Sequence, residues 1–448
     1  MGEARVEKAT APEMLSYGGV QFSASIYMAF TSYYLMMFLI DIALIPAAVT
    51  AVLLVCYRIF SALDTQVIAI FINRSRFKDG KYRPYYKWCA LPFAAGLAAL
   101  GMTPVIGAPG RVVFAAAALI ICDLSWSTIH MASISLLPYL ARDDVSRSKL
   151  TSFSNGSSIL AFILVGSFML PIADFLGSGD KGSGFSSALG ILALITLPLI
   201  FNAYFRLKEH SYMEPKVRPA IKDVFFAILS NRRVMLFLSG LGLYFMADAF
   251  KNVTTLYYMT HVMGRSDLLP VVILAGLLSP LAMQPVIPRL LRFARKEVLI
   301  VIGLFSALCA SLLMLAAGTS PVALICCVVL YGVFTSIVAN LVFAVMASLT
   351  DDIRERQNIS MSEMLAATMN LSSNIAAGVA GGAAALTLGF VGYLPPVMGQ
   401  AVAQPDAVLA GIRVLYIVCT AAGMALAGAI MLLFRNKSTK EVTGHALP

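Results

Sequence analysis

Six ionisable side chains lie inside otherwise apolar stretches of this sequence, and they have the chemistry to hold an ion, a proton or a polar solute: Arg58, Asp64, Asp123, His130, Asp248 and Lys251. An ionisable group in hydrocarbon costs roughly 2.5–3.5 kcal/mol on insertion scales. Such groups therefore usually face a cavity or a partner rather than lipid.

Arg58, Ser61 and Thr65 stand at i, i+3 and i+7, which places them on one helical stripe, with Asp64 on the neighbouring row. Two interpretations stay open: an ion pair that fixes helix packing, or a proton or ligand site. A hard cation needs several oxygen ligands. Asp64 has no second acid beside it in the sequence, so a proton is favoured over sodium, although neutral oxygens of Ser61 and Thr65 could still contribute to a sodium site.

Asp123, Trp126 and His130 are also spaced i, i+3 and i+7, so an acid, an indole and an imidazole share one predicted helix face. That face suits a cyclic polar ligand. His130 is either a packed core histidine or a group that binds solute or carries a proton. Asp248 and Lys251 stand at i and i+3, which favours an ion pair between them.

The elements that carry these residues are membrane spans. The 448 residues are 59% hydrophobic and only 12% charged, against about 25% charged in soluble domains. Apolar runs near ~20 residues read as transmembrane helices. An all-α membrane protein of about twelve spans follows, at 16–40, 46–73, 85–108, 111–141, 150–175, 184–206, 233–262, 268–290, 297–318, 321–350, 358–392 and 406–434.

The net charge of +10 does not indicate nucleic-acid binding, because the basic residues crowd into alternate loops. Loops rich in Lys and Arg stay in the cytoplasm. We therefore predict a multi-pass protein of the cell membrane with both termini cytoplasmic. Its partners would be the lipid bilayer and a small-molecule substrate, with no nucleic acid.

The spans divide into two sets of six. The predicted organisation is an N-terminal bundle over 1–206, a cytoplasmic linker over 207–232 and a C-terminal bundle over 233–448. Six plus six spans joined by a cytoplasmic bridge is the layout of the major facilitator fold. We expect such a protein to function as a monomer.

One segment is specific enough to indicate a family: the loop 73–84, Asn-Arg-Ser-Arg-Phe-Lys-Asp-Gly-Lys-Tyr-Arg-Pro. With Ser16-Tyr17-Gly18 opening the first span and Arg58 in the second, it resembles the glycoside–pentoside–hexuronide:cation symporters, the melibiose-permease-like branch of the major facilitators. The resemblance covers nearly the whole chain and is strongest over 16–150.

The resemblance implies a cation site in the second span and a sugar site at the middle of the membrane, but both are altered here. Ser61 and Thr65 occupy the positions of the family's two cation-binding aspartates, and Asp64 that of its asparagine. The implied solute site consists of Ser25, Arg58, Trp126, His130, Asn155 and Asn374. A coupled proton would be carried by Asp64 or His130.

Charges on the predicted cytoplasmic loops either form a gate or only set the topology. In the first interpretation, bridges between the halves hold the outward-open state and break when the cytoplasmic side opens. The residues proposed for it are Gly80, Lys81, Arg83, Asp143 and Asp352.

The favoured function is a secondary active transporter that moves a sugar, glycoside or uronate-like solute by alternating access, with a proton as the favoured coupling ion. A uniporter and a lipid or lysolipid transporter on the same fold stay open. A membrane-embedded enzyme is disfavoured because no hydrolase or metalloprotease motif is present. We expect no cofactor and no metal site.

Overall fold

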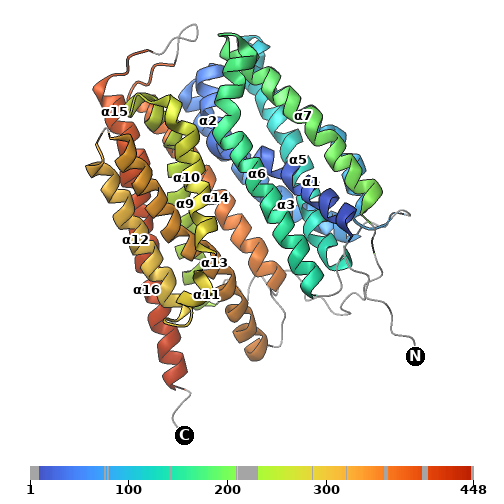
Figure 1. The fold of residues 1–448 in the computed structure, drawn as a ribbon, viewed down its shortest axis with the longest axis vertical. Coiled ribbons are helices and arrows are strands. Elements are labelled where there is room, and N and C mark those ends of the chain that lie inside the picture. Colours follow the sequence, from blue (N-terminus) through green and yellow to red (C-terminus); the bar gives the residue numbers. More distant parts are fainter. Residues whose placement is uncertain are drawn as a thin grey trace. The chain divides into compact units, whose positions relative to one another are not determined.

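The computed structural model describes residues 10–74, 77, 80–140, 144–207, 209, 231–284, 286–318, 320–357, 362–395 and 402–444. Nearly all of these residues are helical (Figure 1). The chain separates into two compact units, 1–214 with 394–403 and 215–393 with 404–448. The predicted linker lies mostly outside the described residues, so its boundaries stay a prediction.

The described residues contain eleven helices long and apolar enough to cross a membrane, or up to twelve when one bent pair counts as a single span. The bent pair joins Ala11–Tyr33 to Leu35–Ile42 at an angle of 62°. Its second arm includes a short helix, α2 (Leu35–Met37), and a π-helical turn, η1 (Phe38–Ile42). The predicted all-helical membrane fold is confirmed.

The first unit, blue to green in Figure 1, contains six main helices among the described residues. Helix α1 packs against α6 and α7, α4 packs against α5 and α7, and α3 packs against α5. Their bounds are α1 (Ala11–Tyr33), α3 (Ala47–Arg74), α4 (Arg83–Met102), α5 (Ala108–Leu140), α6 (Asp144–Gly177) and α7 (Lys181–Arg206).

The second unit, yellow to red in Figure 1, repeats this packing order. Helix α9 packs against α14 and α16, α12 packs against α13 and α16, and α10 packs against α13. In both units the first main helix also leads into a π-helical turn, η1 in one and η3 (Tyr258–Val262) in the other. The bounds are α9 (Arg232–Tyr257), η4 (Ser266–Leu268), α10 (Leu269–Met283), α11 (Ile287–Leu290), α12 (Lys296–Ala316), α13 (Pro321–Gln357), α14 (Ser362–Phe390), α15 (Asp406–Arg413), η5 (Val414–Cys419) and α16 (Thr420–Gly444).

Local sequence sets where several spans begin. Asp180 caps α7, since its carboxylate accepts hydrogen bonds from the backbone N–H groups of Gly182 and Ser183, both at 3.0 Å. Asn231 caps α9 by accepting from Arg233 and Val234 at 3.0 and 3.3 Å. A side-chain oxygen at this position satisfies N–H groups that the helix itself leaves unpaired.

Candidate functional site

Two carboxyl groups of the first unit meet where α3 and α5 pack together. Asp64 is 5% exposed and Asp123 only 1% exposed, and the two groups are close enough to interact directly. The Oδ1 atom of Asp64 accepts from Ser127 Oγ and Thr65 Oγ1, both at 3.1 Å. Among the described residues, the Oδ2 atom of each carboxylate has no hydrogen-bond partner.

Two buried tyrosines hold Asp123 in place. The Tyr57 hydroxyl donates to Asp123 Oδ1 at 3.1 Å, and the Tyr27 and Tyr57 oxygens lie 2.9 Å apart. Tyr27 comes from α1, Tyr57 from α3 and Asp123 from α5, so three helices meet at this carboxylate. The sequence interpretation missed both tyrosines, because a single tyrosine in an apolar helix carries no signal beyond packing.

Arg58 is near this cluster but is not paired with it. Its guanidinium lies over the ring of Tyr57, 5.3 Å from the centroid. In the part of the chain that the structure describes, no ion pair joins it to Asp64 or Asp123. The ion pair considered for Arg58 and Asp64 is therefore not formed, and the positive charge acts on Asp123 only at longer range.

Asp123 is the second acid beside Asp64 that the sequence analysis did not identify. It lies on a different helix from Asp64, so the spacing of residues within the second span could not show that the two meet. Two carboxylates in contact in an apolar site do not both stay ionised unless a proton or a cation lies between them. The cluster can thus hold one exchangeable positive charge, with hydroxyls of Thr65 and Ser127 already oriented toward it.

Trp126 and His130 form an aromatic wall on α5. Their rings stack with centroids 5.0 Å apart and planes 13° apart, as their spacing predicted. The Trp126 ring also lies 6.4 Å from that of Tyr27. The indole Nε1 is buried and has no hydrogen-bond partner among the described residues. A buried indole N–H usually finds a partner, so the unsatisfied donor at Trp126 is a distinctive feature of this wall.

The remaining residues of the predicted solute site are more scattered. Ser25 is buried on α1, two residues before Tyr27. Asn155 is exposed on α6, and Asn374 is partly buried on α14 of the second unit. In the described part of the first unit, no hydrogen bond or ring contact joins Asn155 to the aromatic wall, so its role, like that of Asn374, stays a prediction.

The second unit has a buried polar cluster of its own. Asp248 accepts from the Asn252 side chain at 2.8 Å and from the Tyr331 hydroxyl at 3.3 Å. Lys251 is 8% exposed, and its ammonium lies over the Tyr331 ring, 4.7 Å from the centroid.

The ion pair expected between Asp248 and Lys251 is absent among the described residues. The i, i+3 spacing would permit it, but Asn252 and Tyr331 take up the carboxylate instead. A desolvated cation–π contact gives up to about 2 kcal/mol, whereas burying an ion costs several kcal/mol. The ring of Tyr331 does not offset this cost by itself, and the nearby Asp248 carboxylate attracts the ammonium without forming an ion pair with it.

The loop predicted to act as a gate is anchored inside the first unit. Glu209 accepts from the backbone N–H groups of Lys81, Tyr82 and Arg83 at 2.7–2.8 Å. Gly80 has a positive φ of 120°, a conformation that favours glycine. The Arg83 guanidinium donates to the Tyr204 carbonyl oxygen at 2.7 Å. The contact with Glu209 was not predicted from the sequence.

The gate itself stays a prediction. Asp143 lies outside the described residues, and the structure describes the backbone of Asp352 but not its side chain. The observed contacts of Arg83 and Lys81 tie their loop to the end of α7. A bridge from this loop to the other half would therefore have to form beside an existing contact with Glu209 or Tyr204.

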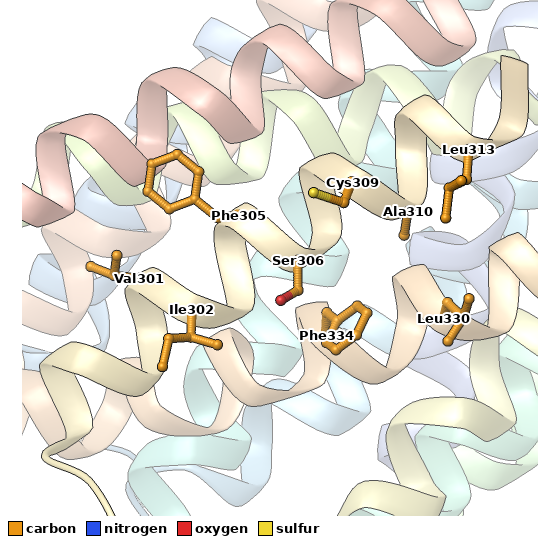
Figure 2. A pocket seen from close by; sticks show the side chains of 9 residues that line it. All are labelled: Val301, Ile302, Phe305, Ser306, Cys309, Ala310, Leu313, Leu330 and Phe334. Atoms are coloured by element: carbon orange, nitrogen blue, oxygen red, sulfur yellow. The ribbon is translucent and has the colours of Figure 1, made fainter.

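A separate cavity of about 390 Å³ lies between α12 and α13. Figure 2 shows Phe305, Ile302 and Phe334 around it, with Ser306 supplying the hydroxyl. A polar solute needs more hydrogen-bonding groups than this lining offers. Its full lining is Val301, Ile302, Phe305, Ser306, Cys309, Ala310, Leu313, Leu330 and Phe334. We therefore do not place the solute site here.

Comparison with known proteins agrees with this architecture. Residues 16–437 match the family described as MFS/sugar transport protein. The chain belongs to this family. It is a multi-pass membrane protein and a secondary transporter of small solutes, and it is not an enzyme.

Several curated relatives carry transporter names. The uncharacterized symporter YnaJ of Bacillus subtilis is 26% identical over 66% of this chain and 64% of its own length. The putative glycoside/cation symporter YagG of Escherichia coli is 22% identical over 96% of this chain and 92% of its own. The isoprimeverose transporter of Lactiplantibacillus pentosus is 24% identical over 85% and 81%.

Solved structures of the same fold include the nucleoside transporter NupG. It superposes with a TM-score of 0.68 at 13% identity, covering 95% of this chain and 99% of that one. At this identity the likeness shows the fold alone, and it confirms the predicted major facilitator fold.

Proposed function

We propose that this family member carries a small polar, sugar-like solute together with a proton that binds at the Asp64–Asp123 pair. The observation that carries the proposal is the direct approach of two buried carboxyl groups, each with one unpartnered oxygen. The names of the relatives, a glycoside/cation symporter and an isoprimeverose transporter, support the solute class.

A proton fits the pair better than a metal cation does. One proton placed between two facing carboxyl oxygens neutralises their repulsion and needs no further ligands. Sodium needs a shell of several oxygens. Here Tyr57 and Ser127 already take up one oxygen of each carboxylate.

The solute would contact the aromatic wall one turn along α5. Trp126 offers a ring face and a free N–H group, and the partly exposed His130 stacks on it. Ser25, Arg58, Asn155 and Asn374 complete the proposed site, and His130 is the second candidate for the coupled proton. Asp123 and Trp126 share one helix, so loading the carboxyl pair would change the charge next to the solute.

We further propose that the protein functions as a monomer in the plasma membrane with both termini in the cytoplasm. The clustering of Lys and Arg in alternate loops supports this orientation. Alternating access between its two repeated units would carry the solute across.

The test is uptake of labelled isoprimeverose into proteoliposomes under an imposed pH gradient or an imposed sodium gradient. We expect the pH gradient to drive accumulation in the wild type. Asp64→Asn and Asp123→Asn should abolish accumulation, because neither keeps a carboxyl pair that can share a proton. Asp174→Asn, which alters an exposed carboxylate near the end of α6, is the matched control and should behave like the wild type.

Two results would contradict the proposal. Accumulation driven by sodium but not by the pH gradient would assign the pair to a metal cation. Unchanged pH-driven accumulation in both asparagine variants would remove the pair from coupling altogether.

A further inference from the structure

A basic segment leads into helix α12 of the second unit. Residues 287–297 contain four basic side chains and one acidic side chain, a net charge of +3. Arg289, Arg292 and Arg295 are exposed. In the part of the chain that the structure describes, their guanidinium groups form no hydrogen bond and no ion pair. These three side chains are therefore available to an anion.

The same segment exposes apolar side chains between its arginines. Phe293 is 88% exposed and Leu291 is 43% exposed. Cations interleaved with exposed aromatic and aliphatic side chains are typical of segments at the bilayer surface. There the cations meet the lipid headgroups and the apolar side chains enter the boundary of the hydrocarbon. The composition of the segment thus indicates contact with lipid.

The apolar cavity between α12 and α13 begins close to this segment. At a helical rise of about 1.5 Å per residue, its lining residue Val301 lies about 7.5 Å beyond Lys296 along α12. The lining continues along α12 as far as Leu313, about 18 Å further. One leaflet of a bilayer contains about 15 Å of hydrocarbon. The cavity is therefore about as long as one leaflet is thick.

The cavity is open at the surface of the second unit. Ile302, Leu313 and Leu330 line it and are 50%, 51% and 41% exposed. Figure 2 shows these side chains along the two helices. The volume of about 390 Å³ lies in the usual range for a site that holds one small molecule. An open apolar cavity on membrane-spanning helices is suited to a hydrocarbon chain.

We propose that this cavity and the arginines beside it bind one molecule of an anionic phospholipid such as phosphatidylglycerol. The phosphate pairs with Arg292 and Arg295, because a planar guanidinium group matches phosphate oxygens. One acyl chain occupies the cavity from Val301 toward Leu313. This inference is independent of the transported solute and of the coupling ion.

Lys296 prepares the mouth of the cavity. Its ammonium donates to the Ala344 carbonyl oxygen at 3.0 Å and also to the Ser348 hydroxyl, both on α13. The two helices that line the cavity are thus joined at the end where the headgroup binds. Lys296 is occupied by this contact, so the phosphate is left to the arginines.

Charge selects the headgroup. Glu297 is the one acidic residue of the segment, against four basic residues. A zwitterionic headgroup would bring its own ammonium toward the arginines, whereas an anionic headgroup gains from each cation. Setting the topology of a loop needs positive charge alone. The adjoining cavity, with the length of a chain in one leaflet, is the observation that indicates a bound lipid.

The experiment counts lipids bound to the purified full-length protein by native mass spectrometry from detergent micelles. The probes are dioleoyl phosphatidylglycerol, dioleoyl phosphatidylcholine as its zwitterionic match, and glycerol 3-phosphate, which has the phosphate but no chain. Titration with each phospholipid gives the apparent affinity for the first lipid bound. Thermal unfolding of each variant without added lipid shows that it is folded.

The headgroup is tested by combining Arg292→Gln with Arg295→Gln. The matched control is Arg206→Gln, an exposed arginine at the end of α7 in the first unit. We expect the wild type and the control to bind phosphatidylglycerol more tightly than phosphatidylcholine. Each cation near an anionic lipid contributes about fivefold. The double variant should therefore lose about tenfold to thirtyfold in affinity for phosphatidylglycerol and keep its affinity for phosphatidylcholine.

The chain is tested by filling the cavity from either helix, with Cys309→Trp on α12 or Leu330→Trp on α13. Both side chains are exposed, so a larger ring can be accommodated and either variant alone decides the question. Each methylene displaced from the cavity costs about fourfold in affinity. Both phospholipids should therefore bind about tenfold more weakly or worse. Cys326→Trp, an exposed cysteine of α13 that does not line the cavity, is the control and should bind like the wild type.

Four results would overturn the lipid site. Equal affinity of the wild type for the two phospholipids would leave the arginines a role in topology only. Displacement of phosphatidylglycerol by glycerol 3-phosphate would assign them to a soluble phosphate. Unchanged lipid binding by a folded tryptophan variant would take the chain out of the cavity. A wild-type dimer that the tryptophan variants convert to a monomer would assign the cavity to a second copy of this chain.

Discussion

At the scale of single residues, the buried polar atoms without partners carry most of the functional information. Asp64 Oδ2, Asp123 Oδ2 and Trp126 Nε1 are buried and lack hydrogen-bond partners among the described residues. A buried polar group left unsatisfied costs about 1–3 kcal/mol. In the proposed mechanism, the missing partner is the ion or solute, which arrives and leaves in each cycle.

Trp126→Phe tests this interpretation of the indole N–H group. The phenyl ring can still stack on His130, but the donor is lost. We expect affinity for the transported solute to fall by about twofold to tenfold, the usual effect of one neutral hydrogen bond. Calorimetric titration of wild type and variant with isoprimeverose measures it. Unchanged affinity together with reduced thermal stability would show that the indole serves packing instead.

At the scale of the helices, side chains at their ends determine where spans begin. The Asp180 carboxylate caps α7 by accepting from Ser183 and Gly182. These backbone N–H groups stabilise the ionised form, so they hold the pKa of Asp180 below its usual value. The cap lies in solvent, where its electrostatic contribution is weakened by screening.

Asp180→Ala should lower the free energy of unfolding by about 0.5–1 kcal/mol, at the low end for an exposed cap. The contribution of the ionised cap is fully present above the unfolded pKa of about 3.9. It is lost as the pH falls through the lower folded pKa. Thermal unfolding of the full chain between pH 3 and about pH 7 follows it, with Asp180→Asn as the neutral control that still caps. An identical acid dependence in Asp180→Asn and wild type would contradict this role.

At the scale of the whole molecule, the two units repeat one packing scheme. In each unit the first main helix packs on the fifth and sixth, the third on the fourth and sixth, and the second on the fourth. Their buried polar clusters differ, however: the first unit has a carboxyl pair and the second an ammonium with a carboxylate. The same packing scheme thus carries the proposed coupling site in the first unit and a different polar cluster in the second.

The proposed orientation gives a prediction for the entire chain. A reporter of location fused at residue 220 and another at the C-terminus should both give a cytoplasmic signal, because the basic loops stay on that side. Fusion of the same reporter at residue 179, between α6 and α7, is the control and should report the opposite side. An extracytoplasmic signal at residue 220 would contradict the arrangement of six spans on either side of the linker.

The sequence by itself determined the membrane spans and the family. A helix that crosses the membrane requires about twenty consecutive apolar residues. Such runs, like the basic loops between them, can be recognised from a short stretch of sequence alone. The predicted spans accordingly match helices such as α3, α7 and α9 within a few residues. Stacking of Trp126 on His130 was also predictable, because both lie on one helix a turn apart.

Only the tertiary structure decided which polar groups meet. Three interactions join residues of different helices: Asp64 interacts with Asp123, Tyr27 forms a hydrogen bond with Tyr57, and the Lys251 ammonium lies over the Tyr331 ring. Each pairing depends on the rotation and depth of two packed helices, which helical periodicity within either sequence does not specify. The expected ion pair of Lys251 with Asp248 is not formed among the described residues: the carboxylate accepts instead from Asn252 on α9 and from Tyr331 on α13.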